Sequence, residues 1–166
     1  MELSISRECL RIVDIADMVV SSDPEDTLVT YSLGSCVGMA IYDQHLRIGG
    51  MIHCMLPLSK LDPQKAAQKP AMFVDTGVPA LLQAMFAAGS QRRNLVIKIA
   101  GAASPLDENG SFRIGERNLA VLRKLLWKNE LLIGAEDTGG AIARTLYLRL
   151  ADGLTMIRAD GQMREL

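Results

Sequence analysis

Aromatic residues and net charge are both scarce in this chain, and the two shortages exclude one large class of partners. Phe, Trp and Tyr together make up 4% of the 166 residues, and the formal net charge is -1 at pH 7. Binding to nucleic acid depends on clustered Lys and Arg, which neutralise phosphates, and often on aromatic side chains that stack on bases. We therefore expect no nucleic-acid partner.

Cysteine is also sparse, and the chain lacks the patterns that direct a protein to or across a membrane. The three cysteines, Cys9, Cys36 and Cys54, are odd in number and irregularly spaced. They indicate reduced thiols rather than a disulfide framework. The N-terminal residues include Arg7 and Arg11 and have no apolar stretch typical of a signal peptide. No segment approaches the roughly 18 apolar residues that span a bilayer. These features predict a cytoplasmic protein without membrane insertion.

Apolar residues, by contrast, make up 49% of the chain, enough for the core of one domain. There is no repeat and no low-complexity tract, so residues 1–166 are interpreted as a single domain. Apolar runs predict strands over residues 37–42, 48–56, 94–100, 131–135, 145–150 and 154–159. Helical spacing predicts helices over residues 76–88 and 116–129. This order predicts a layered α+β domain with a largely antiparallel sheet and helices packed on one side.

The ends of the first helix and the segment before it carry turn and cap signals. The polar stretch 57–70, which contains several prolines, is expected to be an exposed loop. Asp75 or Thr76 is the expected N-cap, which would leave Pro79 in the first turn of the helix. Gly89 is the expected end of the helix.

Two apolar runs around a short polar turn predict an antiparallel hairpin for residues 37–56. If the hairpin turns between Gln44 and His45, Cys36 lies directly opposite His53 on the same face. Their Cβ atoms would then be about 4.5–5.5 Å apart. A slip of one residue would turn His53 to the other face, so this interpretation depends on the register.

A thiol and an imidazole at that distance form a candidate nucleophile and base. The thiolate is the nucleophile, and a nearby histidine lowers the thiol pKa or removes its proton. Gly34 and Ser35 precede Cys36 and offer free backbone N–H groups for an oxyanion hole. Thr30 is a candidate for the third group, which would orient the ring of His53 through its hydroxyl or its backbone carbonyl.

Structural roles are the alternative for each of these residues. A lone Cys on a strand is usually a small buried apolar residue, and a lone His is often a satisfied core residue. Adjacent strand residues point to opposite faces, so His53 and Cys54 cannot easily share a metal ion, and Cys54 is assigned to the core. No metal site is expected. Glu136 and Asp137 are interpreted as structural or capping residues, and Gly139-Gly140 as a tight turn rather than a phosphate loop.

Two motifs and several shorter blocks occur in the order of a known family. The motifs are Thr-x-x-Leu-Gly-Ser-Cys-Val at Thr30–Val37 and His-x-Met-Leu-Pro at His53–Pro57. The shorter blocks are Asp75-Thr76, residues 98–104, residues 114–118 and residues 135–140. In these features, which cover most of its length, the chain resembles the CheD family, the chemoreceptor glutamine deamidases of bacterial and archaeal chemotaxis.

The resemblance implies a fold, an activity and a substrate. The family's catalytic Cys, His and Thr fall on Cys36, His53 and Thr30. The implied reaction is attack of the cysteine on a glutamine carboxamide, loss of ammonia and hydrolysis of a thioester to glutamate, with receptor methyl esters as possible further substrates. The glutamines would lie on the cytoplasmic helical domains of chemoreceptors, and no cofactor is implied. The implied fold is an α+β layered sandwich of mixed, largely antiparallel sheets with helices packed on the outside, akin to a bacterial toxin deamidase.

The chain departs from the family pattern at two positions outside the proposed dyad. The family often has glycine where this chain has Ala102, and Asn or His where it has Ala141. Arg144 retains a basic residue that usually follows. We expect Gly139, Gly140 and Arg144 to lie on a substrate or partner surface, while a binding role for position 141 is in doubt.

Two other functions remain open. The chain would serve as a non-catalytic regulatory binding partner of a CheC-type phosphatase, a partner that the resemblance also implies, or as a thiol hydrolase acting on another amide. The intact set of Thr30, Cys36 and His53 favours the deamidase, because a pure binder has no need of these three residues.

Overall fold

The computed structural model describes residues 9–104 and 113–166, and its strands form two five-stranded sheets. The first sheet has the order β1 (Leu10–Ile12), β3 (Thr27–Leu33), β8 (Arg144–Arg149), β9 (Thr155–Ala159), β10 (Gln162–Glu165). The second has the order β2 (Met18–Ser21), β5 (Ile48–Cys54), β4 (Val37–Asp43), β6 (Leu95–Gly101), β7 (Ile133–Thr138). The pairs β1–β3 and β6–β7 are parallel, and the other neighbours are antiparallel.

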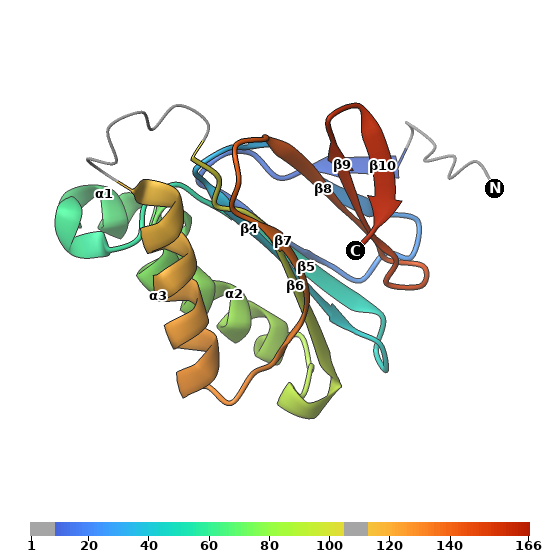
Figure 1. The fold of residues 1–166 in the computed structure, drawn as a ribbon. Coiled ribbons are helices and arrows are strands. Elements are labelled where there is room, and N and C mark those ends of the chain that lie inside the picture. The colour runs from blue at the N-terminus through green and yellow to red at the C-terminus, as the bar shows by residue number, and fades with distance from the viewer. Residues whose placement is uncertain (1–8, 105–112) are drawn as a thin grey trace.

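The helices lie on one side of the second sheet, and the first sheet lies on its other side (Figure 1). They are α1 (Pro63–Gln68), α2 (Val74–Ala87) and α3 (Ile114–Lys128), with short 3-10 segments η2 (Ser59–Leu61), η3 (Pro70–Met72) and η4 (Arg92–Asn94). The predicted α+β sandwich of mixed, largely antiparallel sheets with outer helices is therefore confirmed. Within the described ranges, no helix is both long and apolar enough to cross a bilayer.

The two central strands, β4 and β5, are buried along their whole length because they lie in the middle layer. Successive residues of a strand point to opposite faces. Met39 and Ile41 accordingly pack in the core under the helices, whereas Ala40 and Tyr42 pack in the core between the two sheets. A strand covered on both faces is apolar at nearly every position, which explains the unbroken apolar runs of the sequence.

The hairpin of β4 and β5 exists, but its predicted register is wrong. Asp43 pairs with Ile48, so the loop is two residues longer than assumed, and Gly38 rather than Cys36 lies directly opposite His53. The Asp43 carboxylate stabilises this longer loop by accepting hydrogen bonds from two backbone N–H groups at 2.9 Å. The error amounts to two residues, and a shift of two leaves every side chain on its predicted face.

Helix α2 also begins differently from the prediction, although it ends as predicted. It begins at Val74 without a side-chain cap, and Pro79 therefore lies inside the helix beyond the first turn. The expected cap residue Asp75 instead accepts hydrogen bonds from the N–H and hydroxyl of Ser59. Gly89 follows the helix with a φ of 105°, a left-handed conformation that favours glycine.

The stretch 57–70 is not the irregular loop that was predicted, since it contains η2, α1 and the start of η3. The Asp62 side chain accepts a hydrogen bond from the N–H of Lys65 at 3.0 Å, and Pro63 occupies the first helical position. Both are regular helix-start signals. The 3-10 segments η2 and η3 contact α2.

Candidate active site

The three residues predicted to be catalytic face the space between the two sheets. The ladder of β4 and β6 extends to Cys36, whose carbonyl accepts a hydrogen bond from the Ala102 N–H at 2.7 Å. Alternation then places Cys36 on the face of Gly38, and its half-buried side chain packs against the core between the sheets. Because Gly38 pairs with His53, Cys36 is the diagonal neighbour of His53 on the same face. Diagonal Cβ atoms in an antiparallel pair are about 7–8 Å apart or closer.

The orientation of the His53 ring is fixed by Thr30, which lies on the facing strand β3. The Thr30 hydroxyl is 2.7 Å from His53 Nδ1 and also 2.7 Å from the backbone carbonyl of Val13. A carbonyl only accepts, so the single hydroxyl hydrogen is donated to Val13, and the hydroxyl oxygen must accept from Nδ1–H. His53 therefore carries its proton on Nδ1, and its Nε2 carries a lone pair. This Nε2 is buried and has no hydrogen-bond partner among the described residues.

Burial shifts the ionisation of both His53 and Cys36 toward their neutral forms. Desolvation lowers the pKa of His53 from 6.5 to about 4, while the nearby Asp14 carboxylate raises it by a smaller amount. Burial raises the pKa of the Cys36 thiol, and its own backbone N–H opposes this with a smaller effect. Of the two predicted effects of the histidine on the thiol, a lowered pKa is therefore not found, and removal of the thiol proton by His53 stays a prediction. Both shifts favour a thiol and a neutral imidazole, so a nucleophilic attack by the sulfur would require its proton to move.

The loop before the candidate nucleophile is held by its carbonyl oxygens. The Gly34 carbonyl accepts from the Ala103 N–H at 2.8 Å, and the Ser35 carbonyl accepts from the side-chain amide of Asn118 at 2.9 Å. In a trans peptide the N–H points opposite to the carbonyl, so the N–H groups of Ser35 and Cys36 point away from these partners. Neither N–H donates to a backbone carbonyl within residues 9–104 and 113–166. The predicted donor on Gly34 is wrong, because the Gly34 N–H donates to the Ser32 carbonyl at 3.0 Å. The N–H groups of Ser35 and Cys36 are the ones left to serve a developing oxyanion, a role that stays a prediction.

A second loop, formed by the end of β6, packs directly on the nucleophile segment. Gly101 has a φ of 100°, and a Cβ at this position would lie 2.4 Å from the Cys36 carbonyl oxygen. Only glycine allows this close approach. The next residue, Ala102, also has a positive φ of 53°, which gives a physical reason for the glycine that the family often carries there.

The glycine pair of the C-terminal half lies beside this loop, but the arginine that follows it is buried. The Gly139 N–H donates to the Gly101 carbonyl at 2.9 Å, and the Ser104 N–H donates to the Gly140 carbonyl at 2.8 Å. Arg144 is 9% exposed, and its guanidinium donates to the Gly139 carbonyl at 2.7 Å. Of the three predicted surface positions, Gly139 and Gly140 thus border the site, whereas Arg144 holds their loop from inside.

The residues that were assigned structural roles occupy structural positions. Cys54 is fully buried in the core under the helices, on the face opposite His53, and burial raises its pKa. Glu136 forms an ion pair with Arg123 at 2.5 Å, and Asp137 forms one with Arg144 at 3.0 Å. Among the residues that the structure describes, no three His, Cys, Asp or Glu side chains gather in a way that could hold a metal ion.

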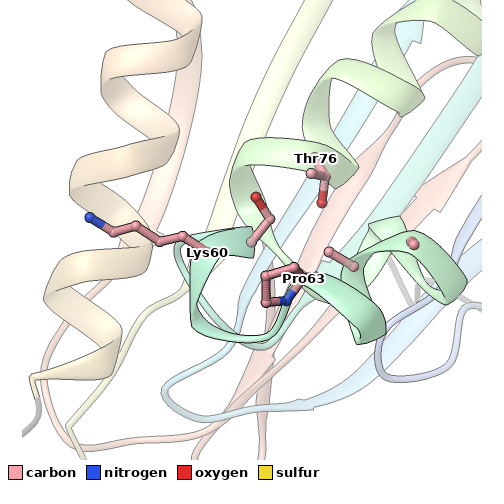
Figure 2. Close-up of a pocket in the computed structure, with 6 residues that line it drawn as sticks. Lys60, Pro63 and Thr76 are labelled. Carbon is pink, nitrogen blue, oxygen red and sulfur yellow. The ribbon is translucent and has the colours of Figure 1, made fainter.

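A separate hollow of about 400 Å³ lies over η2, α1 and the first turn of α2 (Figure 2). Six residues line it: Ser59, Lys60, Pro63, Ala66, Ala67 and Thr76. Its two hydroxyls are already engaged, since Ser59 donates to Asp75 and Thr76 donates to the Pro70 carbonyl. None of the three candidate catalytic residues lines this hollow, and its lining offers no nucleophile–base pair.

Two contacts of the site were missed from the sequence. The Val13 carbonyl, which fixes the direction of the Thr30 hydroxyl, is a backbone group and leaves no signal in a residue pattern. Asn118, which holds the Ser35 carbonyl, lies in one of the blocks that resemble the family, and this was the signal that could have drawn attention to it.

Comparisons with known proteins show the family of this chain. A family model described as "CheD chemotactic sensory transduction" matches residues 55–159. A protein of Syntrophus aciditrophicus named "Probable chemoreceptor glutamine deamidase CheD 1" is 46% identical over 156 residues, which cover 93% of this chain and 98% of the relative. A "Probable chemoreceptor glutamine deamidase CheD" of Solibacter usitatus is 44% identical over 155 residues, covering 93% of this chain and 92% of the relative.

The chain therefore belongs to the CheD family. The matched range of the family model begins after Thr30, Cys36 and His53, and the relatives extend the similarity over nearly the whole chain. A solved structure from Neisseria meningitidis covers 80% of this chain and 63% of its own at 11% identity and a TM-score of 0.41, too distant a likeness to indicate a function.

Proposed function

We propose that this protein is a chemoreceptor glutamine deamidase, in which Cys36 is the nucleophile, His53 the general base and Thr30 the residue that orients the base. The observation that carries the proposal is the Nε2 atom of His53, a buried lone pair whose ring is oriented through Nδ1 by the Thr30 hydroxyl. General-base activation of a cysteine requires a free imidazole nitrogen on the same side of the sheet as the thiol.

The first half of the proposed reaction forms a thioester. The Cys36 sulfur attacks the carboxamide carbon of a glutamine side chain while its proton passes to Nε2 of His53. The oxygen of the tetrahedral intermediate takes the negative charge and accepts hydrogen bonds from the N–H groups of Ser35 and Cys36. The C–N bond then breaks, and the Nε2 proton passes to the leaving nitrogen, which departs as ammonia.

The second half hydrolyses the thioester. A water molecule gives its proton to Nε2 of His53 and attacks the thioester carbon, and the same N–H groups stabilise the second oxyanion. Collapse of the intermediate breaks the C–S bond, returns the proton to the sulfur and leaves glutamate. Methyl esters of receptor glutamates fit the same sequence with methanol as the leaving group, so we extend the proposal to them.

The names of the relatives support receptors as substrates. We propose that the substrate glutamines lie on the cytoplasmic helical domains of chemoreceptors, which also makes the protein cytoplasmic. The carbonyls of residues 34–36 accept hydrogen bonds from Ala102, Ala103 and Asn118. The exposed residues Gly140 and Ala141 lie at the same end of the sandwich. This leaves the face with the free N–H groups for a protruding side chain.

The test is ammonia release from a purified receptor cytoplasmic fragment, with mass spectrometry to detect the gain of about one dalton per converted glutamine. We expect Cys36→Ala to abolish both signals. Cys54→Ala is the matched control. It also removes one thiol, but from the face of β5 that packs under the helices, away from His53. Full activity of Cys36→Ala would reject the nucleophile assignment.

The same experiment separates the deamidase from the alternative of a non-catalytic partner of a CheC-type phosphatase. A pure binding module releases no ammonia from any receptor fragment, and its affinity for the phosphatase is the same in the wild type and in Cys36→Ala. The Thr30–His53 hydrogen bond favours the enzyme, because a docking surface gains nothing from a buried, oriented lone pair.

A further inference from the structure

Asn118, on α3, joins the segment that carries the nucleophile to the strand that carries the base. Its side chain is fully buried. The amide nitrogen donates to the Ser35 carbonyl at 2.9 Å and to the Met55 carbonyl at 3.0 Å. Ser35 immediately precedes Cys36, and Met55 follows His53 by two residues. One side chain therefore links the backbone on both sides of the candidate catalytic pair.

The bond to the Ser35 carbonyl also sets the direction of the Cys36 N–H. Carbonyl and N–H of this peptide point in opposite directions, and the described chain contains no cis peptide. With the carbonyl held toward α3, the N–H points away from the helix layer. This N–H is one of the two proposed oxyanion donors.

The position of Asn118 depends in turn on Gly115, one turn earlier in α3. A Cβ at Gly115 would lie 2.5 Å from the Ala103 carbonyl oxygen and 2.7 Å from the Ala102 carbonyl oxygen. The helix can therefore rest on this loop only because residue 115 has no side chain. That close approach brings the Asn118 amide within reach of the two carbonyls.

We propose that Asn118 is a positioning residue for the acyl-transfer reaction, acting through the Ser35 and Met55 carbonyls on the Cys36 N–H and on the spacing of the thiol from His53. This rests on the proposed function. The amide oxygen has no hydrogen-bond partner among the described residues, so the residue acts here through its donors. A carboxylate at this position would have the same shape without those donors and would repel both carbonyls.

The experiment compares Asn118→Ala and Asn118→Asp with Leu122→Ala. Leu122 lies one turn further along α3, is fully buried and makes no contact of this kind. Truncating a buried leucine costs about 2–5 kcal/mol of stability, so this variant controls for helix destabilisation alone. All variants are assayed at a temperature at which each is folded.

We expect kcat for ammonia release to fall about 100-fold in both Asn118 variants, as for loss of one oxyanion donor, with KM within about twofold of the wild type. We expect Leu122→Ala to keep the wild-type kcat. Gly115→Ala should lower kcat as well, because its methyl group pushes the helix off the loop. Unchanged kcat in Asn118→Ala, or an equal fall in Leu122→Ala, would overturn the proposal.

A second readout does not need a receptor substrate. We expect the pH profile for alkylation of Cys36 by iodoacetamide to shift in the Asn118 variants and not in Leu122→Ala. If the wild type releases no ammonia from any receptor fragment, the proposed function fails, and this profile alone tests whether Asn118 positions Cys36. An identical profile in Asn118→Ala and the wild type would then refute it.

Discussion

Acidification should destabilise this protein, because burial lowers the pKa of His53. The loss in free energy of unfolding follows from the difference in this pKa between the folded and the unfolded chain. The folded protein keeps the ring neutral down to a pKa of about 4, whereas the unfolded chain binds a proton near 6.5. Between these values the unfolded state holds more protons, so the free energy of unfolding falls as the pH falls. The stabilisation is complete above pH 6.5. The loss amounts to about 2 kcal/mol at pH 5 and about 3 kcal/mol by pH 4.

The assay is urea unfolding at several pH values from 7 to 4.5, with wild type and His53→Asn compared. The asparagine amide nitrogen takes the place of Nδ1 and keeps the hydrogen bond to Thr30, but it does not titrate. We expect the wild type to lose about 2 kcal/mol more than His53→Asn between pH 7 and pH 5.

The chain offers a matched control, because its second histidine, His45, lies exposed in the loop of the hairpin. His45→Asn should follow the wild-type curve at every pH. Parallel curves for wild type and His53→Asn between pH 7 and pH 5 would refute the reasoning, since they would mean that the folded protein protonates His53 as readily as the unfolded chain does.

Three further predictions concern the same end of the molecule. Thr30→Val should lower kcat by at least tenfold, because it removes the acceptor of the Nδ1 proton, whereas Thr30→Ser keeps the hydroxyl and should stay near wild-type activity; equal kcat values would contradict the role of the hydroxyl. Iodoacetamide should alkylate Cys36 slowly at pH 7 and faster with increasing pH, since burial raises the thiol pKa; a plateau reached below pH 7 by mass spectrometry would contradict this. Gly101→Ala should lower the free energy of unfolding by about 2–4 kcal/mol in urea titration, more than the roughly 1–2 kcal/mol expected for Gly140→Ala, because only at Gly101 would the new methyl group meet a backbone carbonyl.

The shared face of the candidate site residues could be predicted from the sequence, because the alternation of side chains along a strand survives a register error of two residues. The hairpin was placed two residues out of register, and the pairing that motivated the dyad, Cys36 directly opposite His53, does not occur. The shift nevertheless left both residues on the face between the sheets, because that face repeats every second residue. The same alternation correctly placed Cys54 and His53 on opposite faces of the sheet.

The parts that failed depend on contacts that no local pattern records. The Asp43 carboxylate stabilises the longer hairpin loop by accepting hydrogen bonds from two backbone N–H groups. Several polar residues lie in this segment, and the sequence does not show which of them will bind the loop backbone. Asp75 was read as a helix cap, but Ser59, from a separate segment, binds it instead. Strands β1, β2, β3 and β10 were not predicted. They are defined by pairing with strands distant in the sequence, and β3 in this way brings Thr30 to the ring of His53.

The third member of the proposed triad is a hydroxyl, which, unlike a carboxylate, carries no negative charge to stabilise an imidazolium ion. A ring that acquires a proton in this desolvated place is a strong acid, as its pKa of about 4 indicates. Such an acid is well suited to protonate a departing amine, the poorest leaving group in amide cleavage. By the same token it is a weak base toward the thiol. In the proposed mechanism, the low polarity of the sandwich interior thus favours expulsion of ammonia over storage of a reactive thiolate between turnovers.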